Sequence, residues 1–184
     1  QPVASLTSYP LGVVVASTTG VQTPKDLVAW LKANPAKAQF GTAGAGGHNH
    51  FLGLQLGKAV GVEATVVPYK GNAPLLTDLI AGHVPAGVMV AGEVTPHLKD
   101  GRVRLVGVLS ATRSPLMPDV PTFLEQSVAV SSGEAWYGMW APARADKAEV
   151  QAAGLLGPDG VVLGLYAHDY LRHDGPEHVL CFAP

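Results

Sequence analysis

A glycine-rich loop at residues 41–47 is the feature of this sequence best suited to binding a ligand. It lies between a strand-like segment, residues 38–41, and a helical pattern that begins near His48. Such a loop directs unpaired backbone N–H groups and the positive end of a helix dipole at one point, which suits a carboxylate or a phosphate. A tight turn with nothing bound is the simpler alternative. The loop residues that would hold the anion are Thr42, Ala43, Gly44, Ala45, Gly46 and Gly47.

The loop does not match the two best-known nucleotide motifs. After Gly44 and Gly46, the position of the third glycine in a dinucleotide fingerprint holds Asn49. No Gly-Lys-Ser or Gly-Lys-Thr follows, so the loop is not a P-loop either. These departures weigh against a nucleotide as the ligand.

Two histidines at the start of the expected helix, His48 and His50, are candidate ligand-binding residues beside the loop. Residues two apart do not share a helix face, and no Cys, Asp or Glu lies nearby to complete a metal site. A looser group of histidines, at positions 168, 173 and 178, lies in a polar C-terminal stretch. We therefore expect no metal and no other cofactor.

A second candidate loop, Pro68-Tyr-Lys-Gly71, could present the Tyr69 hydroxyl and the Lys70 ammonium to the same anion. An exposed turn without a ligand explains these residues equally well. The sequence shows no candidate nucleophile for catalysis. No Gly-x-Ser-x-Gly occurs, and the single cysteine, Cys181, has no positioned base near it in the sequence.

Charge and hydropathy narrow the possible partners. The 184 residues carry 12 Lys and Arg against 14 Asp and Glu, so the net charge of −2 offers no basic surface for nucleic acid. No apolar run approaches the roughly 20 residues that a membrane span requires. Residues 1–5 have neither the basic start nor the apolar stretch of a secretory signal, so we expect no signal peptide in this chain.

Short apolar runs alternate with helical patterns along most of the chain, which predicts an α/β fold. We expect a mostly parallel sheet with helices on both faces. Thr23, Pro24 and Asp26 together predict a capped helix start. The expected strands are residues 11–16, 38–41, 63–67, 84–90, 103–109 and 136–140, and the expected helices are residues 24–34, 48–60, 73–81 and 93–99.

An ordered set of motifs along residues 10–150 resembles the extracytoplasmic solute receptors of tripartite tricarboxylate transporters, also called Bug proteins. The motifs are Thr23-Pro-Lys-Asp-Leu27, Lys32-Ala-Asn-Pro35, Phe40-Gly-Thr-Ala-Gly-Ala-Gly46, Val67-Pro-Tyr-Lys-Gly71, Pro96-His-Leu-Lys-Asp-Gly101, Val103-Arg-Leu-Val-Gly-Val108 and Arg113-Ser-Pro-Leu-Met-Pro-Asp-Val-Pro-Thr122 with Glu125. The resemblance implies a periplasmic receptor for a small organic carboxylate (a dicarboxylate, tricarboxylate, amino acid or aromatic acid). It also implies membrane transporter subunits as partners of the full-length receptor, and no enzymatic activity.

The resemblance also implies a domain organisation. It suggests a type II periplasmic-binding-protein-like fold with one lobe complete and the other partial. Residues 1–16 would be a partial first lobe with a crossover strand, and residues 17–107 the ligand-binding lobe. Residues 108–150 would return to the first lobe, and residues 151–184 form a tail unlike the family.

Individual positions of the family's ligand loop can be compared with this chain. Thr42, Gly44 and Gly46 match the loop, and His50 matches the histidine that opens its helix. Gly47 stands where a Ser or Thr hydroxyl is usual. Met89 and Pro85 occupy positions that are commonly acidic, and the loss of an acidic group at Met89 favours a plain carboxylate over a ligand with an amine.

Two other functions fit parts of the sequence. A small α/β enzyme acting on an anionic substrate could use His48 or His50 as a general base and Lys70 as an electrostatic clamp. A folded remnant that associates without any ligand is the structural alternative, and the sequence leaves the oligomeric state open.

Overall fold

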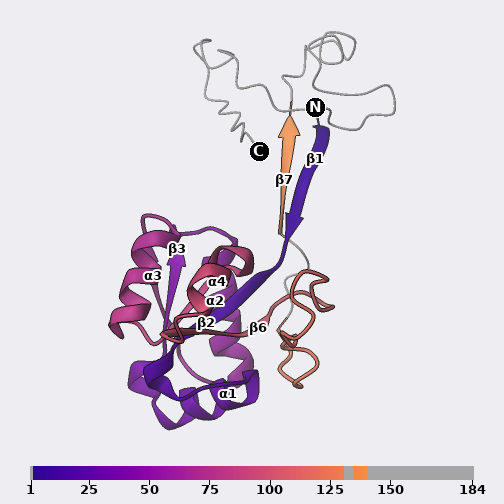
Figure 1. The fold of residues 1–184 in the computed structure, drawn as a ribbon. Coiled ribbons are helices and arrows are strands. Elements are labelled where there is room, and N and C mark those ends of the chain that lie inside the picture. Colours follow the sequence, from indigo (N-terminus) through magenta and orange to yellow (C-terminus); the bar gives the residue numbers. More distant parts are fainter. Residues whose placement is uncertain (1, 131–134, 141–184) are drawn as a thin grey trace. The chain divides into compact units, whose positions relative to one another are not determined.

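The computed structural model describes residues 2–130 and 135–140, and these fall into two units. The larger unit is Tyr9–Ala135, and the smaller one combines Gln1–Ser8 with Trp136–Pro184. In the smaller unit, β1 (Pro2–Tyr9) pairs with β7 (Ala135–Trp140) in a two-stranded sheet (Figure 1). The strand expected at 136–140 is confirmed, whereas β1 was not anticipated from the sequence.

The tail at residues 151–184, with its histidines and Cys181, lies outside the described residues.

The larger unit contains every other helix and strand expected within its residues. Its strands are β2 (Leu11–Ala16), β3 (Gln39–Ala43), β4 (Thr65–Tyr69), β5 (Ala86–Val90) and β6 (Val103–Val108). Its helices are α1 (Pro24–Ala33), α2 (His48–Val60), α3 (Asn72–Ala81) and α4 (Ala91–Leu98), with short 3-10 helices at Ser17–Thr19 and Pro35–Lys37. Of the helices in the described part of the chain, none has both the length and the apolar character that a membrane crossing requires.

Five strands form the central sheet in the order β4-β3-β5-β2-β6. β3 pairs in parallel with β4 and with β5, whereas β2 is antiparallel to both β5 and β6. Four strands therefore run in one direction and β2 runs against them, which confirms a mostly parallel sheet. The apolar sequence of β2 could not reveal its direction, because any strand covered on both faces reads as one continuous apolar run.

Two strand boundaries differ from the expectation. Pro68 and Tyr69, predicted to lie in a turn, are the last residues of β4, and Thr42 and Ala43 extend β3 beyond residue 41. The parallel ladder explains both extensions, since Thr42 is opposite Pro68 and Ala43 is opposite Tyr69. Pro68 is tolerated because β4 is an edge strand, where a missing backbone N–H can face away from the sheet.

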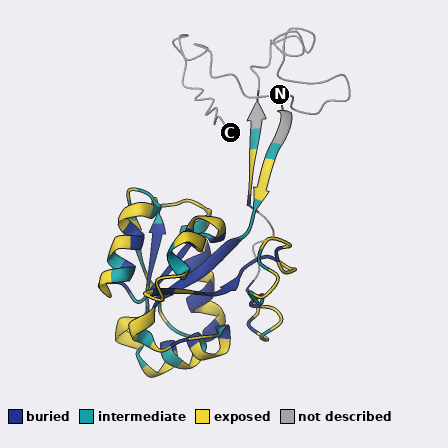
Figure 2. Cartoon of the chain, viewed as in Figure 1, coloured by how far each residue is buried: buried dark blue, intermediate teal, exposed yellow. Residues whose placement is uncertain are grey.

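Helices cover both faces of this sheet, as predicted. Leu27 and Leu31 of α1 belong to one buried cluster with Leu52 and Leu56 of α2 and with Phe40 of β3. A second buried cluster joins residues of α3 and α4 to the other face: Val14, Leu75, Leu76, Leu79, Met89, Ala91, Val94 and Leu105. Figure 2 shows the inner strands of the sheet as buried and the outer sides of the helices as exposed. The residues of the edge strand β4 are exposed or only partly buried. Burying each large aliphatic side chain contributes about 1.5–3 kcal/mol, so these two layers hold the sheet and its loops in place.

The start of α1 has the cap predicted from the sequence. The Thr23 hydroxyl accepts a hydrogen bond from the Asp26 amide at 3.2 Å, and the Asp26 carboxylate accepts one from the Thr23 amide at 2.9 Å. The interaction of the Asp26 carboxylate with the Thr23 side chain, followed by its hydrogen bonds from the Thr23 and Gln22 amides, lowers the pKa of Asp26 below its ordinary value of 3.8. Two of the backbone donors at this end of α1 are thus satisfied by neighbouring side chains.

The segment after β6 is fastened to the sheet by a small polar cluster. Thr122 forms a bridge with Val108, and the Arg113 Nε donates to the Glu125 carboxylate at 2.9 Å. The same carboxylate accepts from the Thr122 amide at 3.0 Å, which chiefly lowers the pKa of Glu125. The proline-rich loop of residues 115–121 is therefore closed at its base, although the predicted division at residue 108 stays a prediction.

Candidate ligand-binding site

The C-terminal ends of β3, β4 and β5 meet at one edge of the sheet, because these three strands run in the same direction. A helix starts after each of them: α2 after β3, α3 after β4 and α4 directly after β5. Each helix N-terminus carries a partial positive charge, so this edge favours an anion. Both predicted binding loops, residues 44–47 and residues 70–71, lie at this edge.

Backbone amides are the main donors that the loop before α2 offers. The Gly44 amide donates to the Tyr69 carbonyl at 2.8 Å, and the first hydrogen bond of the helix runs from His50 to the Gly47 carbonyl at 3.1 Å. Between them lie five amides, for which no acceptor is present within the described residues. They are the amides of Ala45, Gly46, Gly47, His48 and Asn49.

The conformation of the loop keeps these amides open to solvent. Residues 44–48 are exposed, and the space around Gly44, Gly46 and Gly47 is empty enough that a Cβ atom there would meet nothing within 4 Å. Gly44 and Gly46 have φ of 84° and 71°, a left-handed backbone that other residues adopt only with strain. Gly47 is the N-cap of α2 and forms no side-chain hydrogen bond to the helix. The free donors are therefore accessible to a ligand from solvent.

Thr42 and Ala43, predicted as binding residues, complete β3 instead of facing the solvent with the rest of the loop. Thr42 is fully buried, and its hydroxyl donates to the Gly44 carbonyl at 3.2 Å. This hydrogen bond braces the turn from the inside. Thr42 thus supports the loop, whereas residues 45–47 present its donors.

The second predicted loop places Tyr69 and Lys70 at the same edge but in different roles. The Tyr69 hydroxyl donates to the Asp78 carboxylate at 2.8 Å, so it is not a free donor for an anion. Burial, then the hydrogen bond and charge of Asp78, raise the pKa of Tyr69 to about 12. The Lys70 side chain is exposed, and its ammonium has no hydrogen bond or ion pair with any described residue. Of the two, Lys70 remains the candidate for contacting an anion.

The two histidines of α2 differ in their surroundings. His48 is exposed, whereas His50 is partly buried and packs edge-on against Phe51 with ring centroids 6.0 Å apart. The Nδ1 atom of His50 is buried without a hydrogen-bond partner among the described residues. Neither ring has an orienting partner of the kind that a general base requires. Within residues 2–130 and 135–140, no three metal-binding side chains lie together.

Sequence reasoning missed a contact between the first turns of α3 and α4. The Asn72 side-chain amide donates to the Glu93 carboxylate at 2.7 Å, and the Asn72 Oδ1 atom is buried without a partner in the described structure. The start of α4 at Ala91 was not predicted, because Gly92 and Pro96 are weak helix formers that obscure the pattern. Glu93 therefore adds a carboxylate near an edge that the sequence indicated as purely anion-binding.

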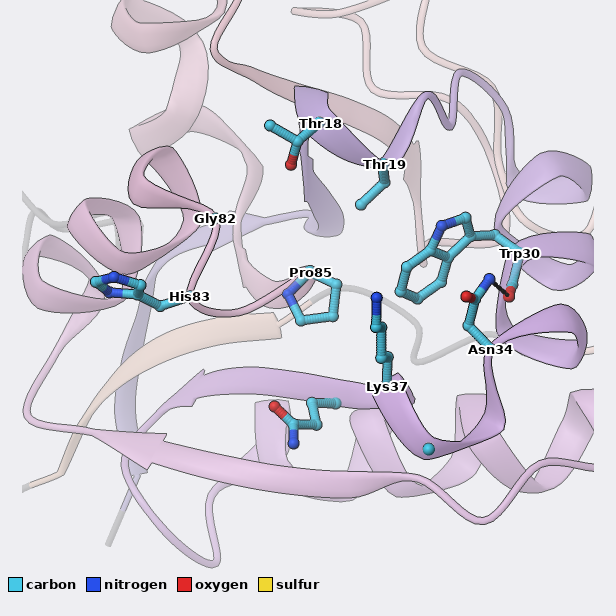
Figure 3. Close-up of a pocket in the computed structure, with 10 residues that line it drawn as sticks. Thr18, Thr19, Trp30, Asn34, Lys37, Gly82, His83 and Pro85 are labelled. Carbon is cyan, nitrogen blue, oxygen red and sulfur yellow. Dashed lines mark hydrogen bonds between the residues drawn. The ribbon is translucent and has the colours of Figure 1, made fainter.

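A hollow of about 410 Å³ lies near the opposite edge of the sheet, where β3 begins and where Pro85 precedes β5 (Figure 3). Figure 3 shows the Lys37 ammonium pointing between Pro85 and the Trp30 ring. The lining residues are Thr18, Thr19, Trp30, Asn34, Ala36, Lys37, Gln39, Gly82, His83 and Pro85. None of the predicted binding residues is among them, so this hollow is distinct from the amide loop.

An α/β lobe with a mixed sheet, and with helix N-termini gathered around an exposed glycine loop, defines a class: the fold is that of a periplasmic binding protein. Residues 1–153 match the sequence profile described as "Tripartite tricarboxylate transporter family receptor". The chain therefore belongs to the tripartite tricarboxylate transporter receptor family, which confirms the resemblance noted in its sequence.

Curated relatives include members of the same family. The chain is 35% identical over 140 residues to the UPF0065 protein in the TAR-I ttuE-ttuC' intergenic region of Agrobacterium vitis, covering 76% of this chain and 40% of the relative. It is 29% identical over 145 residues to the protein BugT of Bordetella pertussis, covering 79% and 44%. The chain thus spans less than half the length of these relatives.

Solved structures show the same fold. Rpa4515 of R. palustris with adipate superposes with a TM-score of 0.76 at 28% identity, covering 86% of this chain and 55% of that one. MatC of Rhodopseudomonas palustris with bound malate has a TM-score of 0.72 at 26% identity, and the match covers 83% of this chain and 53% of MatC. The periplasmic binding protein BugD gives 0.73 at 30% identity, covering 86% and 55%. The family and these neighbours are solute-binding proteins, not enzymes.

Proposed function

We propose that the exposed loop of this lobe binds a small organic carboxylate through its free backbone amides, as part of a receptor for a tripartite tricarboxylate transporter. The observation that carries the proposal is the run of five unpaired amides from Ala45 to Asn49 at the start of α2. Backbone N–H groups that converge at a helix N-terminus are a recurrent anion site. Lys70, an exposed residue of the neighbouring loop at the same edge, adds a positive charge that attracts an anion.

The solved relatives support the choice of a carboxylate. One of them was solved with adipate and another with bound malate, and both are dicarboxylates. The edge also carries Glu93, but its carboxylate is engaged by the Asn72 side chain. Met89, at the position where the family commonly has an acidic residue, has a neutral thioether side chain, so it adds no charge to the site. The neutral residue at position 89 favours a plain carboxylate over a ligand with an ammonium group, whereas the charge of Glu93 opposes this preference.

We further propose a periplasmic location and delivery to the membrane subunits of the transporter, by analogy with the family. The chain matches only 53–55% of the length of the solved receptors. A ligand enclosed from two sides gains more contacts than one held from a single side. We therefore expect this chain by itself to bind carboxylates weakly, in the millimolar range that corresponds to about 4 kcal/mol of binding free energy.

The proposal is tested by titrating the protein with malate, adipate, citrate, glutamate and benzoate while recording ¹H–¹⁵N correlation spectra. We expect at least one acid to shift the amide signals of residues 45–49, with saturation at millimolar concentration. When that acid is malate, adipate, citrate or benzoate, its full methyl ester carries no charge, is the matched control and should leave these signals in place. Saturable binding of an acid with no shift at residues 45–49 would place the ligand elsewhere, and no binding of any acid would refute the proposal.

A further inference from the structure

The position of the amide loop depends on the end of an edge strand. β4 is the outermost strand on its side of the sheet and pairs only with β3. Its last residue, Tyr69, accepts the hydrogen bond from the Gly44 amide at 2.8 Å, directly before the free amides begin. If the end of β4 frays from the sheet, Gly44 loses this acceptor and the loop loses its fixed start.

The Tyr69 side chain ties this strand end to α3. Its hydroxyl donates to the Asp78 Oδ2 at 2.8 Å, and the His83 Nδ1 lies 3.3 Å from the Asp78 Oδ1. The ring also lies close to β3, since a Cβ atom on Gly41 would approach the Tyr69 Cε2 to 3.2 Å. α3 itself is firmly held, because Leu75 and Leu79 are fully buried against the sheet.

We propose that Tyr69 and Asp78 are positioning residues for the ligand loop. Their hydrogen bond fixes the end of β4 on α3, and the Tyr69 carbonyl then holds Gly44 so that the amides after it keep one orientation. A loop that is ordered before binding does not have to be ordered by the ligand, which preserves affinity. The expected effect on ligand affinity rests on the proposed function. The expected effect on the order of the loop does not depend on that function.

The protonation states of the pair agree with this role. Hydrogen bonds from Tyr69 and then from His83 lower the pKa of Asp78 below its ordinary value of 3.8. Burial raises the pKa of Tyr69 to about 12, with Asp78 adding to the effect. At neutral pH the phenol is therefore a permanent donor and the carboxylate a permanent acceptor.

The first test measures hydrogen exchange of the Gly44 amide by NMR in the absence of ligand. We expect Tyr69→Phe and Asp78→Ala each to speed this exchange about tenfold, the loss expected for one hydrogen bond to a charged group. The double variant should be no faster than either single variant, because both remove the same interaction. Asp78→Asn keeps an oxygen that can accept from the phenol but loses the charge, so its exchange rate should lie between those of the wild type and Asp78→Ala.

Two outcomes of this exchange experiment would overturn the proposal. One is unchanged protection of Gly44 in Tyr69→Phe. The other is an equal acceleration of exchange in β2 and α1, which would indicate a general loss of stability instead of a local release. Thr77→Ala, on the same helix, removes only a hydroxyl that bonds to the Ala73 carbonyl and serves as the matched control.

The second test measures the affinity for malate and adipate. We expect Tyr69→Phe and Asp78→Ala to bind about three- to tenfold more weakly, Asp78→Asn to lose less affinity than Asp78→Ala, and Thr77→Ala to bind as the wild type does. Equal affinity of wild type and Tyr69→Phe would refute the positioning role. If the wild type binds none of malate, adipate, citrate, glutamate and benzoate, the proposed function fails, and the exchange of Gly44 still decides whether the pair orders the loop.

Discussion

Helices α1 and α2 begin in opposite ways. At α1, Thr23 and Asp26 satisfy two backbone donors through side chains. At α2, the N-cap is Gly47, which has no side chain to offer, and the amides on both sides of it have no acceptor among the described residues. The same chain thus caps the start of one helix with side chains and leaves another without a side-chain cap.

The bare helix starts share a location. Like α2, helices α3 and α4 have N-caps without side-chain hydrogen bonds, namely Gly71 and Val90, and all three start where the parallel strands end. A glycine N-cap forgoes roughly a few tenths of a kcal/mol of stability relative to Ser or Asp, and an apolar N-cap such as Val90 forgoes about 1 kcal/mol. The first amide of α4, that of Ala91, donates to the Pro10 carbonyl at 3.1 Å, so the proposed anion site rests on the open amides before α2.

Converting the bare start into a capped one should have the largest effect. In Gly47→Asp, the new carboxylate can accept from the Asn49 amide and repels an incoming anion, so we expect carboxylate binding to be lost. Gly47 has φ of −81° and open space around it, so the variant should fold. Its free energy of unfolding should rise by about 0.3–1 kcal/mol, because the charge interacts with the helix dipole. Calorimetric titration and thermal denaturation measure the two effects.

Gly47→Ser is the matched control for this substitution. A neutral hydroxyl caps the helix without repelling an anion, so the stability should rise slightly and the affinity should stay within a few-fold of the wild type. Undiminished binding in Gly47→Asp would show that the start of α2 is not the anion site.

Straining the loop backbone should have an intermediate effect. In Gly46→Ala, a side chain must adopt φ of 71°, which costs about 1–2 kcal/mol of stability and displaces the neighbouring donors. We expect carboxylate binding to weaken about tenfold, an estimate that corresponds to misplacing one or two hydrogen bonds. Gly20→Ala is the control, since Gly20 has a matching φ of 72° and open space. It should lose similar stability and no affinity.

Removing the cap of α1 should change stability alone. Thr23→Ala loses the hydroxyl that accepts from the Asp26 amide, and we expect the free energy of unfolding to fall by about 1 kcal/mol. Chemical denaturation measures this loss. Carboxylate affinity should be unchanged, and a parallel fall in affinity would mean that the capped and bare helix starts are not independent.

The smallest expected effect is a change in the titration of one phenol. The pKa of Tyr69 lies near 12 against an ordinary 10.0, so its contribution to stability is complete below pH 10 and is lost as the pH rises through 12. Phenol ionisation is followed by the absorbance at 295 nm. Subtracting the titration curve of Tyr69→Phe from that of the wild type leaves the titration of the Tyr69 phenol. In an Asp78→Ala background the same difference should move toward pH 10, and a titration near 10 in the wild type would contradict the hydrogen bond to Asp78.

Local patterns predicted the fold well where neighbours in sequence decide the structure. The cap at Thr23 and the start of α2 at His48 were both found from the sequence, because caps and helix periodicity involve residues a few positions apart. The glycine loop was identified for the same reason. The predicted end of β4 was wrong. The pairing of Tyr69 with Ala43 depends on β3, a strand that lies about 25 residues away in the sequence.

The sequence by itself determined that a glycine loop precedes a helix without a capping side chain, and that helices and strands alternate around it. Only the tertiary structure decided which donors stay open. The Gly44 amide meets the Tyr69 carbonyl and the Tyr69 hydroxyl meets Asp78, whereas the next five amides meet nothing in the described residues. A donor forms a hydrogen bond only if the folded chain brings an acceptor within about 3 Å of it. These acceptors come from other strands and helices, so the local sequence does not reveal them.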